Sequence, residues 1–118
     1  MDGEQPVLRD YIQVWFRKGF HIVYVSSINY IRTDKGVLYL SVGGNDEQIR
    51  VTETLEHLLD RLPKGRFVRI HRRYAVHITH VQGIKKGYVT LSIPENKQLS
   101  ISKEGKARLL EALGILPW

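Results

Sequence analysis

The sequence predicts a single, mainly β domain of antiparallel strands with two short helices. Many short segments alternate apolar and polar residues and are separated by turn residues, whereas helical apolar spacing occurs only at about residues 52–62 and 103–113. The strand–helix alternation that a parallel sheet requires is absent. A chain of 118 residues has room for one modest core, so we expect a lead-in over residues 1–10 and one domain over 11–118.

The first half of the chain is predicted to be strands joined by tight turns. Alternating or β-branched segments predict strands at residues 11–16, 20–25, 28–31, 37–42 and 48–51. In the first strand Ile12, Val14 and Phe16 share one face, and the turn at residues 17–19 makes a hairpin with the second. The segment 33–36 carries a strong turn signal before the fourth strand.

The segment from Thr52 to Leu62 breaks this rhythm and predicts a helix. Leucines recur at helical spacing along it, at positions 55, 58, 59 and 62. Thr52 is the expected N-cap, acidic residues near the start complement the helix dipole, and Pro63 ends the helix.

Strands return after this helix and lead to a second one. Residues 67–78 predict one or two short strands, and residues 88–93 and 98–101 predict a hairpin around a polar turn. The final helix is expected at residues 103–113, with Ser102 as its N-cap, Gly114 as its stop and Leu109, Leu110 and Leu113 on one face.

The positive charge of the chain is concentrated in one segment. The formal net charge is +6, yet no Asp or Glu lies between Asp60 and Glu95. That interval holds eight basic residues, namely Arg61, Lys64, Arg66, Arg69, Arg72, Arg73, Lys85 and Lys86. A localised basic surface favours a polyanionic partner, with nucleic acid ahead of an anionic membrane; the alternative is a solubilising face.

Other classes of function find little support in the sequence. There is no cysteine, which excludes disulfides and thiolate metal sites and fits the cytoplasm. The spacing of His71, His77 and His80 matches no zinc signature, and neither a paired-carboxylate motif nor a phosphate-binding loop is present. No apolar run approaches the ~18 residues that span a bilayer. We therefore expect no enzymatic activity, no metal or cofactor and no membrane insertion.

Strand alternation separates the arginines of residues 67–78. In a straight strand Arg69, His71 and Arg73 share one face, which leaves Arg72 at the end of the face carrying Val68 and Ile70. Arg72 must either emerge where the strand stops or pair with a distant acid such as Glu53 or Asp60. A guanidinium held at a strand end is suited to bidentate recognition of guanine.

The start of the last helix is a second candidate contact. A helix N-terminus favours a phosphate, and Ser102, Lys103 and Lys106 lie at or near it. Lys103 opposes the helix dipole, which is an unusual choice unless an anion binds there. The alternative is that both lysines are ordinary solvated side chains.

Four segments in order resemble one known family. Residues 67–76, FVRIHRRYAV, resemble the signature F-x-R-I-H-R-S-Y-x-V-N of the LytTR DNA-binding domain. Residues 25–31, 54–58 and 99–103 are similar to its I-x-Y-I strand, its L-x-x-L helix and its closing P-V-S-R. The resemblance covers nearly all of residues 11–113.

The resemblance implies a fold, a partner and contact residues. Such domains are elongated antiparallel β structures, typically output modules of bacterial response regulators, which insert loops into successive grooves of promoter DNA and commonly bind direct repeats as two copies. The chain is either an output domain whose receiver or sensor domain lies outside it, or a stand-alone domain. By position, base contacts are expected from Arg72, Lys103 and Lys35, phosphate contacts from Arg69, Arg73, Ser102 and Lys106, and support from His71.

The chain also departs from the family pattern. Arg73 replaces the usual Ser, Lys103 the closing Arg, Ser100 the Pro, His77 the motif Asn, and Arg32 a common acid. These changes leave the target sequence open. The alternative function is a basic-surfaced signalling module that binds an anionic ligand or an acidic protein. An RNA-binding domain ranks last, because the aromatics it would need for stacking are scattered.

Overall fold

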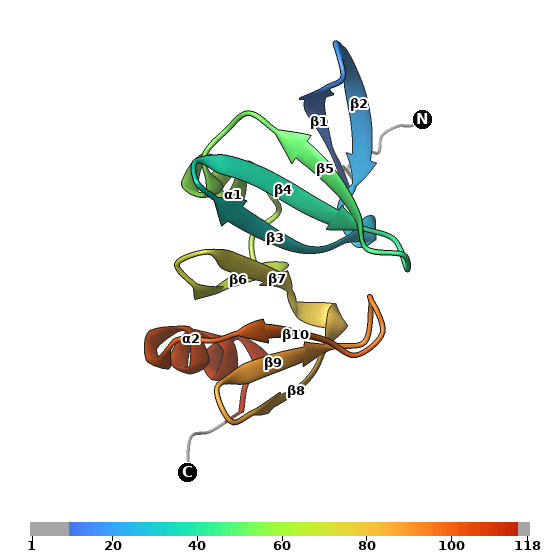
Figure 1. Ribbon diagram of the computed structural model, residues 1–118. Helices are drawn as coiled ribbons and strands as arrows, with labels where there is room; N and C mark the ends of the chain where they lie inside the picture. The colour runs from blue at the N-terminus through green and yellow to red at the C-terminus, as the bar shows by residue number, and fades with distance from the viewer. Residues whose placement is uncertain (1–9, 116–118) are drawn as a thin grey trace, which may run out of the picture.

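The computed structural model describes residues 10–115 and consists of antiparallel sheets stacked along one axis (Figure 1). A two-stranded hairpin lies at one end, a five-stranded sheet in the middle, and a three-stranded sheet with the last helix at the other end. The principal extents are 47 × 37 × 25 Å, which fits the elongated β architecture expected from the resemblance.

The hairpin pairs β1 (Tyr11–Phe16) with β2 (Gly19–Tyr24) through a turn at Arg17 and Lys18. Ile12 and Val14 are buried as predicted, whereas the side chain of Phe16 lies outside the described part of the structure. A single 3-10 turn, η1 (Val25–Ser27), then redirects the chain into the central sheet.

The central sheet has the strand order β5-β4-β3-β7-β6. Its members are β3 (Ile28–Asp34), β4 (Val37–Val42), β5 (Glu47–Val51), β6 (Phe67–His71) and β7 (Tyr74–His77). The third strand is longer than predicted, because its outer half pairs with β4 up to Asp34 opposite Val37. The basic stretch, residues 67–78, forms the two strands β6 and β7, and β7 lies between β3 and β6 in the sheet.

The first helix, α1 (Leu55–Arg61), is shorter than predicted and has a different cap. Thr54 is the N-cap, since its hydroxyl accepts the N–H of His57 at 3.1 Å; the choice of Thr52 was wrong. Thr52 belongs to the connection after β5, where Glu53 is free to pair with Arg61 at 2.8 Å.

The C-terminal sheet has the order β10-β9-β8. It follows a second 3-10 turn, η2 (Ile78–His80), and comprises β8 (Val81–Lys85), β9 (Tyr88–Leu91) and β10 (Lys97–Ser100). The last helix, α2 (Lys103–Leu113), has the predicted bounds, with Ser102 as N-cap and Gly114 as a left-handed C-cap. Leu109 is buried but Leu113 is exposed, so the predicted apolar face was wrong at its far end.

Two hydrophobic cores lie on opposite sides of the central sheet. One contains the inner face of the hairpin, α1 and Ile31 and Ala75 of the sheet. The other contains Tyr30, Ile70 and Val76 of the sheet together with the C-terminal sheet and α2. Because strands expose alternate faces, the apolar members of the basic stretch supply both cores while its charged members stay outside.

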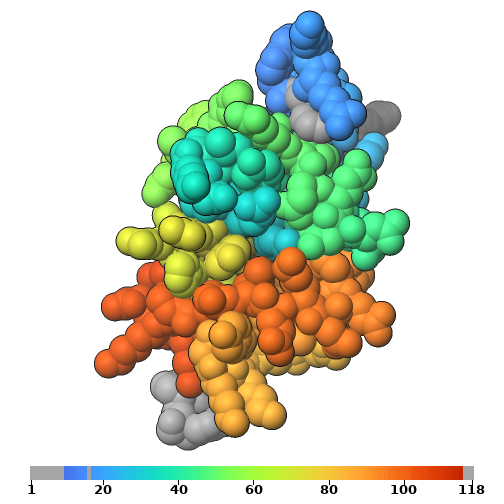
Figure 2. All heavy atoms as spheres, viewed as in Figure 1, coloured from blue at the N-terminus to red at the C-terminus, as the bar shows by residue number. Residues whose placement is uncertain are grey.

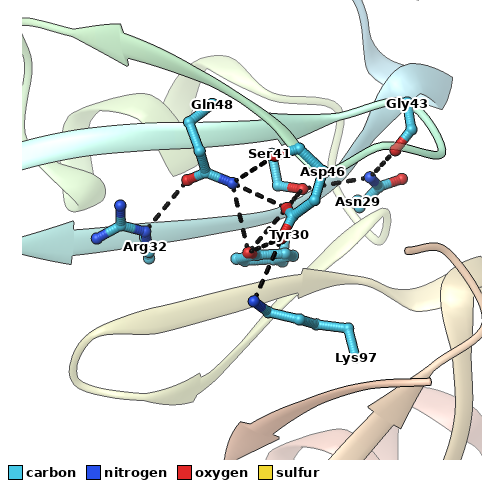
Figure 3. A network of polar contacts seen from close by, with 8 residues as sticks. All are labelled: Asn29, Tyr30, Arg32, Ser41, Gly43, Asp46, Gln48 and Lys97. Atoms are coloured by element: carbon cyan, nitrogen blue, oxygen red, sulfur yellow. Dashed lines mark hydrogen bonds and ion pairs between the residues drawn. The ribbon is translucent and has the colours of Figure 1, made fainter. Parts of the chain in front are cut away.

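A polar network ties the central sheet to the C-terminal sheet (Figure 3). The Asp46 carboxylate accepts the hydroxyls of Tyr30 and Ser41, and Lys97 of β10 pairs with it at 3.2 Å. Burial raises the pKa of Tyr30, and the nearby Asp46 raises it further. Burial alone would raise the pKa of Asp46 too, but hydrogen bonds from Ser41, Tyr30 and Lys97 lower it overall, so the carboxylate stays ionised.

Candidate nucleic-acid interface

The β6–β7 turn carries Arg72 and Arg73 at the edge of the central sheet. β6 ends at His71, β7 begins at Tyr74, and both arginines of the turn are exposed. Arg72 therefore emerges where the strand stops, which is one of the two arrangements expected for it. The placement of Arg73 on one strand face with Arg69 and His71 was wrong, because the strand ends before Arg73.

The backbone of this turn is held from three sides. Arg69 donates from Nη2 to the carbonyl of Arg72 at 2.6 Å, and His71 Nδ1 accepts the N–H of Arg73 at 3.1 Å. The carbonyl of Arg73 accepts the N–H of Thr33 on β3 at 3.0 Å. A rigid backbone lets the two exposed guanidiniums project from a defined position, which lowers the entropy lost on binding.

His71 is suited to this task because it remains neutral. Burial, followed by the positive charges of Arg72 and Arg73, lowers the pKa of His71. A neutral imidazole can present an unprotonated Nδ1, whereas a protonated one could only donate. The Arg73 N–H therefore keeps its acceptor at neutral pH.

Arg69 is engaged within the protein. Besides the Arg72 carbonyl, its guanidinium pairs with Glu56 of α1 at 2.9 Å, and this contact lowers the pKa of the Glu56 carboxyl. The pair is largely exposed on the Glu56 side, so its stabilising effect is small. A phosphate contact by Arg69 stays a prediction; the observed bonds point first to a role in positioning the turn.

Several other basic residues of the acid-free segment also find partners elsewhere in the chain. Arg61 pairs with Glu53, and Arg66 pairs with Asp10 at 3.3 Å. Within residues 10–115, no hydrogen bond or ion pair involves the guanidiniums of Arg72 and Arg73. The alternative arrangement, in which Arg72 pairs with Glu53 or Asp60, is therefore not formed.

The start of α2 is fastened directly beside this turn. The Ser102 N–H donates to the carbonyl of Ile70 at 2.8 Å, while its hydroxyl accepts the N–H of Gly105 at 2.9 Å. Arg108 donates from Nε to the carbonyl of Arg69 at 2.9 Å. Lys103 and Lys106 are exposed at this end of the helix. Ser102 is confirmed as the N-cap of α2. Its hydrogen bond to Ile70 also holds the start of α2 beside the β6–β7 turn.

Gly105 makes this close approach feasible and was missed by the sequence analysis. A Cβ atom at Gly105 would lie 1.9 Å from the carbonyl oxygen of Ile70. Only glycine lets the first turn of α2 rest on the backbone of β6. A glycine within a helical pattern was the available signal, since it costs helix stability unless packing requires it.

The β3–β4 turn lies at the same edge of the sheet. Lys35 and Gly36 occupy it with positive φ angles of 51° and 80°, and Lys35 is exposed. The Thr33–Arg73 hydrogen bond places it next to the β6–β7 turn. Figure 1 shows both turns and α2 on one side of the molecule, and in Figure 2 the β6–β7 turn and α2 project from that side.

A groove runs between the β6–β7 turn and α2. Six residues line it, namely Arg69, His71, Arg72, Ser102, Glu104 and Arg108. The β8–β9 turn with exposed Lys85 and Lys86 meets the same end of α2, because the N–H of Ile101 donates to the carbonyl of Gly87 at 3.0 Å. Sequence reasoning counted these two lysines in the charge but did not connect them with α2.

The described residues assemble neither a metal site nor a bilayer-spanning helix. Among residues 10–115 no three side chains of the His, Asp and Glu types are grouped so as to hold a metal ion. The rings of His77 and His80 stack at 4.8 Å, away from the β6–β7 turn. None of the described helices combines the length and apolarity needed to cross a bilayer.

The family comparison agrees with this geometry. The model of the LytTr DNA-binding domain matches residues 18–114. The chain belongs to the LytTR family. A solved LytTr DNA-binding domain, from a Bacillus cereus protein described as a methyl-accepting/DNA response regulator, is similar in fold, with a TM-score of 0.73 and 19% identity over 91% of this chain and 99% of that one. A comparison with curated protein sequences gives no significant match.

Proposed function

We propose that this LytTR domain binds duplex DNA in a sequence-specific manner by inserting turns of a β scaffold into successive grooves. The observation that carries the proposal is the β6–β7 turn, whose backbone is held by three hydrogen bonds while the Arg72 guanidinium is unpaired within the described structure. No recognition helix of the helix-turn-helix kind is needed, because the exposed cations lie on turns and at the start of one helix.

Each residue of the edge is assigned a role that its position supports. Arg72 reads a base, because a guanidinium can bond O6 and N7 of guanine together. Lys103, at the start of α2, and Lys35, on the β3–β4 turn, contact bases on either side of it. Arg73, Ser102 and Lys106 contact phosphates, with the α2 N-terminus adding its partial positive charge. His71 and Arg69 hold the turn.

Membership of the LytTR family supports the biological setting that we propose. As a LytTR domain, the protein serves in transcription regulation in bacteria, in the cytoplasm, as the output of a receiver or sensor domain outside this chain. Two copies occupy direct repeats in promoter DNA. One 25 Å-thick domain with three contact points along one edge can follow the groove of only a short site, so a second copy extends the recognised sequence.

The first test is selection of bound sequences from a random duplex pool at moderate salt. A recovered direct repeat is the expected result, whereas the absence of any enriched sequence would refute specific duplex recognition. Salt dependence distinguishes the alternative module that binds a small anion or an acidic protein. A protein neutralising Z phosphates shows a log–log slope of about −0.9Z, so a slope near one would favour the alternative.

The second test is Arg72→Ala on the selected site. Loss of a bidentate base contact should cost about 1–3 kcal/mol on that site and little on random DNA. Arg50→Ala is the matched control, because it removes an exposed arginine at the opposite edge of the same sheet. If Arg72→Ala weakened binding to the selected site and to random DNA equally, Arg72 would be a phosphate contact and not a base contact.

A further inference from the structure

The outer face of the β1–β2 hairpin is largely apolar and about half exposed in the described structure. Alternation along the two strands turns Ile12, Val14 and Val23 toward the core and leaves the opposite face to solvent. That opposite face, here called the hairpin face, consists of Tyr11, Gln13, Trp15, Phe20, Ile22 and Tyr24. It holds five of the nine exposed large hydrophobic side chains in residues 10–115, from Tyr11 at 42% exposure to Phe20 at 71%.

The hairpin face has one aromatic pair at each end and smaller side chains between them. Trp15 and Phe20 meet edge to face at 5.0 Å near the tip, and Tyr11 and Tyr24 do so at 6.2 Å near the base. Gln13 lies opposite Ile22 between them. Such cross-strand pairs are stable, so the face presents a defined shape rather than loose side chains.

The area of the hairpin face decides what it can bind. Five large side chains that are about half exposed offer roughly 500 Å² of surface, taking ~150–250 Å² for each aromatic residue. A patch of this size matches the largest apolar patch on a typical monomer, and such patches are often functional. Two such faces in contact would bury roughly 1,000 Å² in total, which is the minimum for a specific protein interface and the size typical of a weak, reversible one.

We propose that the hairpin face is a dimer interface between two copies of this chain. In a two-fold contact the same surface serves both copies. An axis through the centre, near Gln13 and Ile22, sets the Trp15–Phe20 pair of one copy on the Tyr11–Tyr24 pair of the other. The same operation brings Lys18 at the tip of one hairpin near Asp10 at the base of the second, whose carboxylate is 56% exposed and also pairs with Arg66 of its own copy.

The dimer leaves the DNA-binding edge accessible. The hairpin lies at the end of the molecule away from α2 (Figure 1). A two-fold axis turns the two DNA-binding edges in opposite senses, so this contact joins copies on separate sites rather than neighbours on one direct repeat. Self-association is measured without DNA, so its result does not depend on whether the proposed DNA recognition is correct.

Sedimentation equilibrium over a range of concentrations tests the dimer. The wild-type chain should associate reversibly to a dimer, and Phe20→Lys should weaken association by about tenfold or more, because it puts a charge into an apolar contact. Tyr88→Lys, at an exposed aromatic residue of β9, is the matched control and should leave it unchanged. Monomeric wild-type protein, or equal weakening by both variants, would overturn the proposal and leave the face to another partner.

Cross-linking tests the symmetry. Because the chain contains no cysteine, Gln13→Cys places a single thiol near the proposed axis. Mild oxidation should then give a covalent dimer in high yield, whereas Gln98→Cys, an exposed position on β10, should not. Equal yields from the two variants would show that collisions alone form the disulfide, and would overturn the two-fold contact.

Discussion

Replacing Gly105 by alanine tests how closely α2 rests on β6. The new Cβ atom would lie 1.9 Å from the oxygen and 2.3 Å from the carbon of the Ile70 carbonyl. Both neighbours are backbone atoms, so no rotamer change can relieve the clash, and the helix must move by about 1 Å or more. Two hydrogen bonds depend on its present position, from Ser102 to Ile70 and from Arg108 to Arg69.

The expected magnitude follows from three opposing effects. Losing two hydrogen bonds costs about 1 kcal/mol each. Overpacking against a rigid neighbour costs about 1–3 kcal/mol more. Alanine improves helix propensity over glycine by ~1 kcal/mol. Packing therefore outweighs propensity, and Gly105→Ala should lower the free energy of unfolding by about 2–4 kcal/mol.

Urea unfolding followed by circular dichroism measures this change. With m near 1–3 kcal/mol/M for a small protein, the midpoint should fall by roughly 1–2 M. The control is Ala107→Gly, at an exposed position of the same helix, which should lose only the ~1 kcal/mol of propensity. A Gly105→Ala protein as stable as the wild type, or more stable, would refute the tight contact between α2 and β6.

Two further outcomes are expected. Burial, and then the charges of His80 and Arg66, lower the pKa of His77 to about 4. Between pH 6.5 and pH 4, therefore, the unfolded chain takes up a proton at His77 and the folded chain does not. The contribution of His77 to the free energy of unfolding is complete above pH 6.5 and should fall by roughly 2 kcal/mol at pH 5. His77→Asn should remove much of this loss in urea titrations at pH 7.5 and 5, and an equal pH dependence in both proteins would contradict the assignment. Arg69→Gln should weaken specific DNA binding without changing the salt slope if Arg69 positions the turn; a slope lower by about 0.9 would instead identify a phosphate contact.

The elements that were predicted well are those with local causes. The caps of α2 at Ser102 and Gly114 involve groups within one or two turns of each other, so the residue types suffice to predict them. The start of α1 was predicted at the wrong threonine, because Thr52 and Thr54 are both residue types that cap helices well. Packing of Leu55 into the core selects Thr54.

The candidate site could be inferred in part from the sequence. The end of a strand made Arg72 a candidate, the start of the last helix made Lys103 one, and the family signature added Lys35; their contacts with DNA stay predictions. The ion pair from Arg69 to Glu56 joins residues 13 apart in the chain, and the bond from Arg108 to Arg69 joins residues 39 apart. Such partners depend on how α1 and α2 pack on the sheet, so no local pattern could predict them.

The sequence by itself determined the fold class, the two helices, the acid-free basic segment and the family, since these follow from local periodicity, composition and a specific motif. Tertiary structure alone decided which cations remain unpaired, because distant carboxylates engage Arg61, Arg66 and Arg69 but not Arg72. It also decided that two turns and the start of α2 share one edge. That placement depends on antiparallel register and on the close contact at Gly105, which are properties of the packed chain.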